Sequence, residues 1–183
     1  MIILITGASC TGKTKLANDL MTKYNIPYFS VDILMMGLYR SNNTCNFTPN
    51  DNSEKISLHV WPILKEMIFT NVENSTNYIY EGFQIKIKDI NEIKEKYKNQ
   101  IFTYYLSFSR EYIENNYSVI KSKRSIIENR TDIDDKNSML ANVQNVEPFR
   151  NSSNYRSFIY EKNFVNENEK IIESIGSDII KFS

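Results

Sequence analysis

A glycine-bearing loop near the N-terminus, set between an apolar run and a helical pattern, constrains this chain more than any other feature. Residues 2–6 (Ile-Ile-Leu-Ile-Thr) form an apolar, largely β-branched run, which is typical of a central parallel strand buried on both faces. Apolar side chains then recur at helical spacing over residues 13–24, and Pro27 breaks this pattern. The order of strand, loop and helix predicts the first unit of an α/β sheet.

The loop has the composition of a phosphate-binding loop and fits the pattern G-x-x-x-x-G-K-[ST] at every fixed position. Gly7 and Gly12 allow backbone angles that a side chain would obstruct, so that successive N–H groups can converge on phosphate oxygens. The following helix adds the positive end of its dipole. Lys13 can reach the β- and γ-phosphates of a nucleotide, and the Thr14 hydroxyl can bind Mg²⁺. The residues predicted to bind the nucleotide are Gly7, Ala8, Ser9, Cys10, Thr11, Gly12, Lys13 and Thr14.

Alternatives stay open both for the loop as a whole and for Cys10 inside it. The same pattern also occurs by chance in an ordinary glycine-rich turn. Cys10, inside the loop, is either a redox-sensitive thiol or a small side chain that is tolerated because its N–H group makes the contact.

Two acidic residues stand where the second and third predicted strands end. Asp32 follows the strand over 28–31, and Glu81 follows the strand over 78–80. The carboxyl ends of parallel strands meet at the ligand-binding edge of an open sheet, so both acids are expected close to the phosphate loop. One carboxylate would help to hold Mg²⁺ and the other would accept a proton from an attacking hydroxyl, and the pattern does not assign the two roles. The alternative is that each acid only caps the helix that follows it.

Arginines supply the third part of the predicted site. Arg40 lies eight residues after Asp32 and could bind an anionic group of the acceptor through its bidentate fork. Arg124 and Arg130 fall in an aperiodic, charged segment, about 121–152, that is typical of a mobile lid. Phosphoryl transfer develops negative charge that a lid arginine can stabilise. The alternative for each arginine is a solvated surface charge.

Strand and helix patterns continue to alternate along the chain, which predicts one α/β domain over 1–183 with a mainly parallel sheet and helices on both faces. The segment over about 121–152 is expected to be a mobile lid of this domain. The other expected elements are strands at 101–107 and 178–182, and helices near 33–39, 53–72, 87–97, 113–120, 154–164 and 167–175.

Composition excludes several classes of function. The chain has 22 basic and 22 acidic residues, so no global field attracts nucleic acid or an anionic membrane. Two cysteines are too few for a disulfide scaffold, and a single histidine disfavours a histidine-rich metal site or a Ser–His–Asp triad. No apolar run approaches the roughly 20 residues that span a bilayer. We expect a cytoplasmic protein with reduced thiols, as a monomer or homodimer.

These motifs resemble those of the P-loop kinases of the nucleoside- and nucleotide-kinase type, over most of residues 1–130. The resemblance rests on 6–14, on 30–32 (Ser-Val-Asp) with 37–40 (Gly-Leu-Tyr-Arg), and on 79–83 (Ile-Tyr-Glu-Gly-Phe). The last stretch is similar to the Asp-Gly-Phe-Pro-Arg segment of adenylate kinases. It is also similar to the Glu-Gly segment of 2-phosphoglycerate-kinase-like and zeta-toxin-like ATPases.

The resemblance implies a five-stranded sheet in the order 2-3-1-4-5, ATP with Mg²⁺ as the donor, and an arginine-bearing lid after the fourth strand. It implies that Lys13 and Thr14 bind phosphate and Mg²⁺, with Lys13 as a catalytic residue. Glu81 is the candidate for the second metal ligand beside Thr14, while the roles of the two strand-end acids stay open. Asp32 becomes the candidate for the acceptor hydroxyl, and Arg40, Glu81 and Gly82 the other candidates for acceptor binding. Arg124 and Arg130 become the candidate catalytic arginines of the lid. The sequence Gln84-Ile85 replaces the Pro-Arg of adenylate kinases, which favours a small hydroxylated acceptor over AMP.

We therefore expect an ATP-dependent kinase that moves the γ-phosphoryl group to a hydroxyl or phosphate of a small molecule. One alternative is a nucleotide-dependent regulatory ATPase or switch that binds a protein partner, although the chain has no clear Asn-Lys-x-Asp element. Another is a zeta-toxin-like kinase of a sugar nucleotide. Phosphorylation of nucleic-acid ends is disfavoured by the zero net charge.

Overall fold

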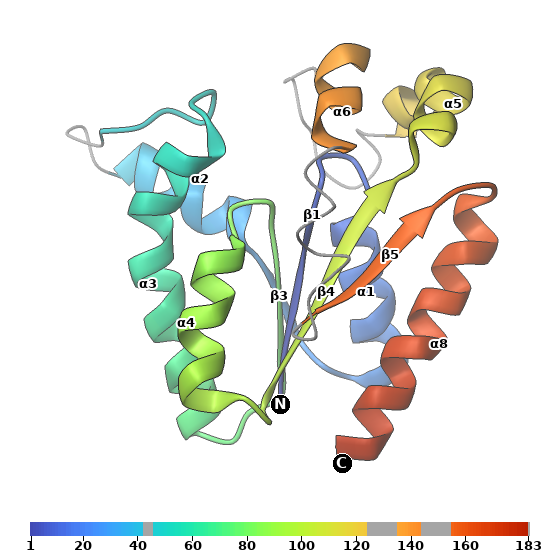
Figure 1. Ribbon diagram of the computed structural model, residues 1–183. Coiled ribbons are helices and arrows are strands. Elements are labelled where there is room, and N and C mark those ends of the chain that lie inside the picture. Colours follow the sequence, from blue (N-terminus) through green and yellow to red (C-terminus); the bar gives the residue numbers. More distant parts are fainter. Residues whose placement is uncertain (42–45, 124–134, 144–154, 183) are drawn as a thin grey trace.

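The computed structural model describes residues 1–41, 46–123, 135–143 and 155–182. Within these residues the strands form one parallel sheet in the order β2-β3-β1-β4-β5 (Figure 1). Both the α/β class and the order 2-3-1-4-5 are thus confirmed. The strands are β1 (Ile2–Gly7), β2 (Tyr28–Ser30), β3 (Tyr78–Glu81), β4 (Ile101–Phe108) and β5 (Arg156–Tyr160).

Helices cover both faces of the sheet, which gives three layers (Figure 1). The helices α1 and α8 lie on one face and α3 and α4 on the other, while α5 and α6 lie beyond the end of β4. The described helices are α1 (Lys13–Tyr24), α2 (Val31–Ser41), α3 (Ser53–Glu73), α4 (Ile87–Tyr97), α5 (Arg110–Lys123), α6 (Lys136–Val143) and α8 (Phe164–Phe182).

The central strand β1 supplies both hydrophobic cores, which explains its unbroken apolar sequence. Ile3 and Ile5 belong to the cluster that α1 and α8 complete, whereas Ile2 and Leu4 belong to the cluster that α3 and α4 complete. All four side chains are fully buried. Because neighbouring side chains of a strand point to opposite faces, a strand covered on both faces needs an apolar residue at every position.

The register of the sheet brings the ends of three strands to one edge. Ile5 of β1 pairs with Glu81 of β3, and Ser30 of β2 pairs with Glu81 from the other side. Gly7, at the end of β1, pairs with Leu106 of β4. The phosphate loop follows Gly7, so the loop and the residues after β2 and β3 share this edge.

The C-terminal part of the chain differs from the prediction. The expected helix over 154–164 is instead the strand β5, and the expected strand over 178–182 is the last turn of α8. The reason is that Ile171, Ile175 and Ile179 recur every four residues and are all buried in one core. Their spacing makes one long amphipathic helix more favourable than a helix followed by a strand.

The expected lid segment is only partly described. The helix α6 lies inside it, whereas residues 124–134 and 144–154 lie outside the described residues. The predictions for Arg124 and Arg130 therefore fall outside the described part of the chain. No helix in the described ranges is both long and apolar enough to cross a membrane.

Candidate active site

The loop after β1 has the positive φ angles that the glycine positions predict. Gly7 has a φ of 135° and Gly12 a φ of 80°, and Cys10 also has a positive φ, of 62°. A Cβ atom on Gly7 would lie 2.0 Å from the carbonyl oxygen of Leu106, so no larger residue fits beside β4 at this point. The loop then enters α1 directly, and the Leu16 N–H donates to Gly12 O at 2.8 Å.

The ammonium group of Lys13 lies over the loop to which it belongs. Its Nζ donates to the carbonyl oxygen of Ala8 at 2.7 Å and to that of Gly7 at 3.3 Å, and the side chain is buried. The Thr11 hydroxyl donates to the same Ala8 oxygen at 2.8 Å. These bonds fix the loop in a curve with a positive charge inside it, which suits a phosphate group.

The Thr14 hydroxyl and the Glu81 carboxylate are in contact, as expected for residues that meet at one edge of the sheet. Thr14 Oγ1 donates to Glu81 Oε1 at 3.2 Å, and Glu81 is only 2% exposed. The pair fits Mg²⁺, which is usually bound by one or two protein oxygens together with phosphate oxygens and water. Nowhere in the described ranges do three His, Cys, Asp or Glu side chains gather as a metal site of their own. The donor set therefore suits a metal that arrives with a nucleotide.

Asp32 lies in the first turn of α2 and not at the end of β2, because the strand ends at Ser30. Its side chain is partly buried, and Asp32 Oδ1 accepts a hydrogen bond of 2.6 Å from Gln84 Nε2. In the sequence, Gln84 stands out only as a departure from adenylate kinases, so its contact with Asp32 is not predicted. The available signal was a polar side chain between Phe83 and Ile85, three residues after Glu81.

Three other predicted residues, Arg40, Gly82 and Cys10, make none of the contacts described above. Arg40 is exposed in the last turn of α2, and a rise of 1.5 Å per residue puts it about 12 Å along the helix from Asp32. Gly82 is buried, and its N–H donates to Ile5 O at 3.0 Å, which extends the bonding between β3 and β1. Cys10 is a half-buried free thiol whose Sγ lies 3.8 Å from Ser9 Oγ.

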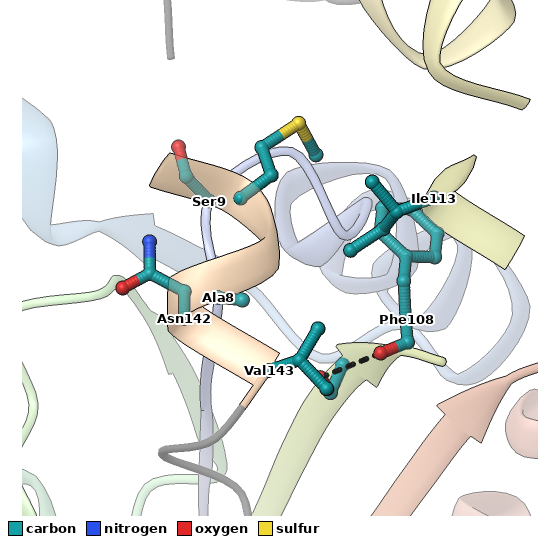
Figure 2. Close-up of a pocket in the computed structure, with 8 residues that line it drawn as sticks. Ala8, Ser9, Phe108, Ile113, Asn142 and Val143 are labelled. Atoms are coloured by element: carbon teal, nitrogen blue, oxygen red, sulfur yellow. Dashed lines mark hydrogen bonds between the residues drawn. The ribbon is translucent and has the colours of Figure 1, made fainter. Parts of the chain in front are cut away.

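A pocket next to the phosphate loop is a feature that no sequence motif marks. It lies where the loop, the end of β4, α5 and α6 meet, as Figure 2 shows. The helix α6, the described part of the expected lid segment, thus lines this pocket together with the phosphate loop. The lining residues are Ala8, Ser9, Ser107, Phe108, Ile113, Met139, Asn142 and Val143.

Comparison with known proteins gives matches among solved structures. No family model matches the chain, and no curated protein matches its sequence. A gluconokinase from Sinorhizobium meliloti 1021 is similar with a TM-score of 0.60 and 12% identity, over 99% of this chain and 96% of the other. A shikimate kinase from Aquifex aeolicus has a TM-score of 0.55 and 14% identity, over 98% and 99%. A sugar kinase from Janibacter sp. HTCC2649 has a TM-score of 0.55 and 12% identity, over 94% and 92%.

The likeness to these structures covers nearly the whole length of both chains, and it shows that this chain has the fold of the P-loop kinases. The resemblance that the sequence motifs indicate is confirmed at that level.

Proposed function

We propose that the protein is a kinase that transfers the γ-phosphoryl group of ATP to a hydroxyl or phosphate of a small molecule. The observation that carries the proposal is the contact between Thr14 and Glu81 beside a phosphate loop that holds the Lys13 ammonium. This is the arrangement that a nucleotide with its Mg²⁺ requires. The structural neighbours named as gluconokinase and shikimate kinase, which act on small molecules, support a small acceptor.

The donor half of the proposed site is the phosphate loop. Its N–H groups and Lys13 would bind the β- and γ-phosphates, with Thr14 and Glu81 as the ligands of Mg²⁺. Charge neutralisation at the phosphates is what the ion supplies when it is bound. Arg124 and Arg130, in the expected lid, would stabilise the negative charge that develops on the transferred phosphoryl group.

The acceptor half lies beyond the ends of β2 and β3. The Asp32 carboxylate would accept the proton of an acceptor hydroxyl, and Glu81 and Gly82 would line the acceptor's side of the site. Arg40 would bind an anionic group at the far end of a longer acceptor. Positioning and charge neutralisation supply most of the rate in such transfers, and the Asp32 carboxylate adds general-base catalysis. We also propose that the protein works in the cytoplasm, as a monomer or homodimer, without nucleic acid or membrane as a partner.

The experiment that tests this proposal is transfer of labelled γ-phosphate from ATP to a panel of acceptors. The panel contains gluconate, shikimate, neutral sugars, nucleosides, nucleoside monophosphates and sugar nucleotides. We expect a labelled product from the wild-type protein and its loss in Lys13→Met, because the ammonium no longer stabilises the phosphates. Lys15→Met is the matched control, since Lys15 is exposed and pairs with Asp19 on the surface.

Each alternative function predicts a different result in this assay. Labelled inorganic phosphate alone, with no labelled acceptor, would contradict the kinase and support a regulatory ATPase. A product formed only from sugar nucleotides would support the zeta-toxin-like activity.

A further inference from the structure

We propose that Gln84 is a positioning residue that aims the carboxylate of Asp32 at the hydroxyl group of an alcohol acceptor. The inference rests on the proposed function, which gives Asp32 its role as proton acceptor. In that step the acceptor oxygen bonds to the γ-phosphorus, and the bond from the γ-phosphorus to the bridging oxygen of ADP breaks. The hydroxyl proton passes to a carboxylate oxygen of Asp32.

The amide of Gln84 binds one face of α2. Gln84 Nε2 donates to Asp32 Oδ1 at 2.6 Å and lies 3.5 Å from Met35 Sδ. Asp32 and Met35 are three residues apart, so they are neighbours on the same face of the helix. The short hydrogen bond selects one rotamer of the Asp32 side chain, whereas the longer contact with Met35 Sδ involves the amide alone.

The carbonyl oxygen of the Gln84 amide indicates that this side chain does not serve to stabilise the fold. Gln84 is 1% exposed, and its Oε1 is a buried atom with no hydrogen-bond partner among the described residues. A Cβ atom on Gly82 would lie 2.6 Å from this oxygen, so Oε1 occupies the space next to that glycine. A buried carbonyl without a donor destabilises a fold, and an apolar side chain of similar size would avoid the cost.

The orientation of the amide follows from its partner. Turning the amide by 180° would place the carbonyl oxygen against the carboxylate of Asp32, and two acceptors would repel each other. The Gln84 carbonyl therefore stays without a donor because the NH₂ group is held by Asp32. A side chain kept at this cost needs a functional explanation, which positioning of the carboxylate supplies.

The segment that carries Gln84 is fixed to the strand that leads into the phosphate loop. The Gly82 N–H donates to Ile5 O at 3.0 Å, and Thr6 Oγ1 donates to Ile85 O at 2.9 Å. Gln84 lies between these two bonds, and Thr6 directly precedes the loop. These contacts fix the position of the Asp32 carboxylate relative to the phosphate loop. Phosphoryl transfer requires such a fixed position, because the acceptor hydroxyl must be aligned with the γ-phosphate.

The test compares Gln84→Leu with the wild-type protein and with Met35→Leu as the matched control, which alters the second contact of the same amide. We measure kcat and KM for ATP and for the alcohol that the acceptor panel identifies, together with the thermal unfolding midpoint. We also record the ¹³C carboxyl resonance of Asp32 in the nucleotide-free protein, assigned with Asp32→Asn.

A positioning role predicts a specific combination of results. In Gln84→Leu, kcat falls about 10- to 100-fold and KM for ATP changes less than about twofold, because only the acceptor's alignment is lost. The unfolding midpoint stays the same or rises, because the buried carbonyl is gone. The Asp32 resonance moves, while Met35→Leu leaves it and kcat close to the wild-type values.

Other results overturn the inference. A wild-type kcat in Gln84→Leu, or an unmoved Asp32 resonance, would show that the amide does not orient the carboxylate. A loss of kcat together with a lower unfolding midpoint and weaker ATP binding would show a structural role. A wild-type protein that labels no acceptor would overturn the proposed function itself, and the resonance experiment separates this failure because it needs no acceptor.

Discussion

At the scale of single residues, the two acids at the edge of the sheet have different surroundings. Glu81 is 2% exposed and its Oε1 accepts from the Thr14 hydroxyl, whereas Asp32 is partly exposed and accepts from the Gln84 amide. The sequence leaves the roles of the two acids open. The contact with Thr14 favours Glu81 for the metal, and the position of Asp32 at the start of α2 favours the acceptor.

This division of roles predicts different effects for two isosteric variants. Asp32→Asn should lower kcat about 10²- to 10⁴-fold, the usual contribution of a general base, and leave the Kd for ATP close to that of the wild type. Glu81→Gln should instead raise the Mg²⁺ concentration that gives half-maximal activity. Steady-state kinetics across a Mg²⁺ series, with calorimetry for ATP, measures both. An altered Mg²⁺ requirement in Asp32→Asn would show that the two acids have exchanged roles.

The amino-acid sequence predicts that Glu81 lies close to the phosphate loop, where the structure shows its contact with Thr14, but it does not predict the contact between Asp32 and Gln84. The first follows from topology, because strand ends of a parallel sheet meet at one edge. The second joins residues 52 positions apart, and it depends on how the segment after β3 turns towards α2. No local pattern records that turn, so only the three-dimensional structure identifies Gln84.

At the scale of elements, the N-terminal half follows local patterns and the C-terminal part does not. An unbroken apolar run and a clear helical period determine β1 and α1. The strand β5 is an edge strand with only one fully buried side chain, Tyr160, so its own sequence gives a weak signal. The pairing of β5 with β4 joins residues that are far apart in the sequence, so no local pattern indicates it. The segment over 178–182 resembles a strand only when the buried isoleucines that precede it are left out of the pattern.

The packing of α8 gives a prediction at this scale, because two adjacent isoleucines have opposite exposure. Ile179 is 6% exposed inside the core shared with α1, while Ile180 is 69% exposed. Ile179→Ala should lower the free energy of unfolding by about 2–4 kcal/mol, since it removes buried apolar surface and leaves a cavity. Ile180→Ala is the matched control and should change it by less than about 0.5 kcal/mol. Urea unfolding followed by circular dichroism measures both, and equal effects would contradict the placement of α8.

At the scale of the whole molecule, both cores of the sheet contain buried phenol groups. Burial raises the pKa of Tyr80 and of Tyr105 to about 12, and it raises the pKa of Tyr104 and Tyr160 as well. Tyr80 packs on the side of α3 and α4, whereas Tyr104 and Tyr160 pack on the side of α1 and α8. Ionisation of these phenols at alkaline pH would therefore destabilise both hydrophobic cores.

The sign of the resulting pH dependence follows from proton binding in the two states. Unfolded tyrosines lose their protons near pH 10, whereas the folded ones keep theirs to about pH 12 in the case of Tyr80 and Tyr105. The folded state then binds more protons, so stability is fully present below pH 10 and falls as the pH rises towards 12. Burial also lowers the pKa of Lys94 to about 8, but this opposite contribution is complete near pH 10.5, where an unfolded lysine titrates.

We expect the free energy of unfolding to fall above pH 10, with each buried tyrosine adding a slope of up to about 1.4 kcal/mol per pH unit. Urea unfolding at half-unit steps from pH 8 to 11.5 measures the slope, and absorbance at 295 nm follows phenol ionisation in the same samples. Tyr80→Phe should give a shallower slope, because phenylalanine has no proton to lose, even though it also removes the hydrogen bond of 2.6 Å from Asn71 Nδ2. Ionisation of all 12 tyrosines near pH 10 in a protein that stays folded would contradict the burial of these phenols.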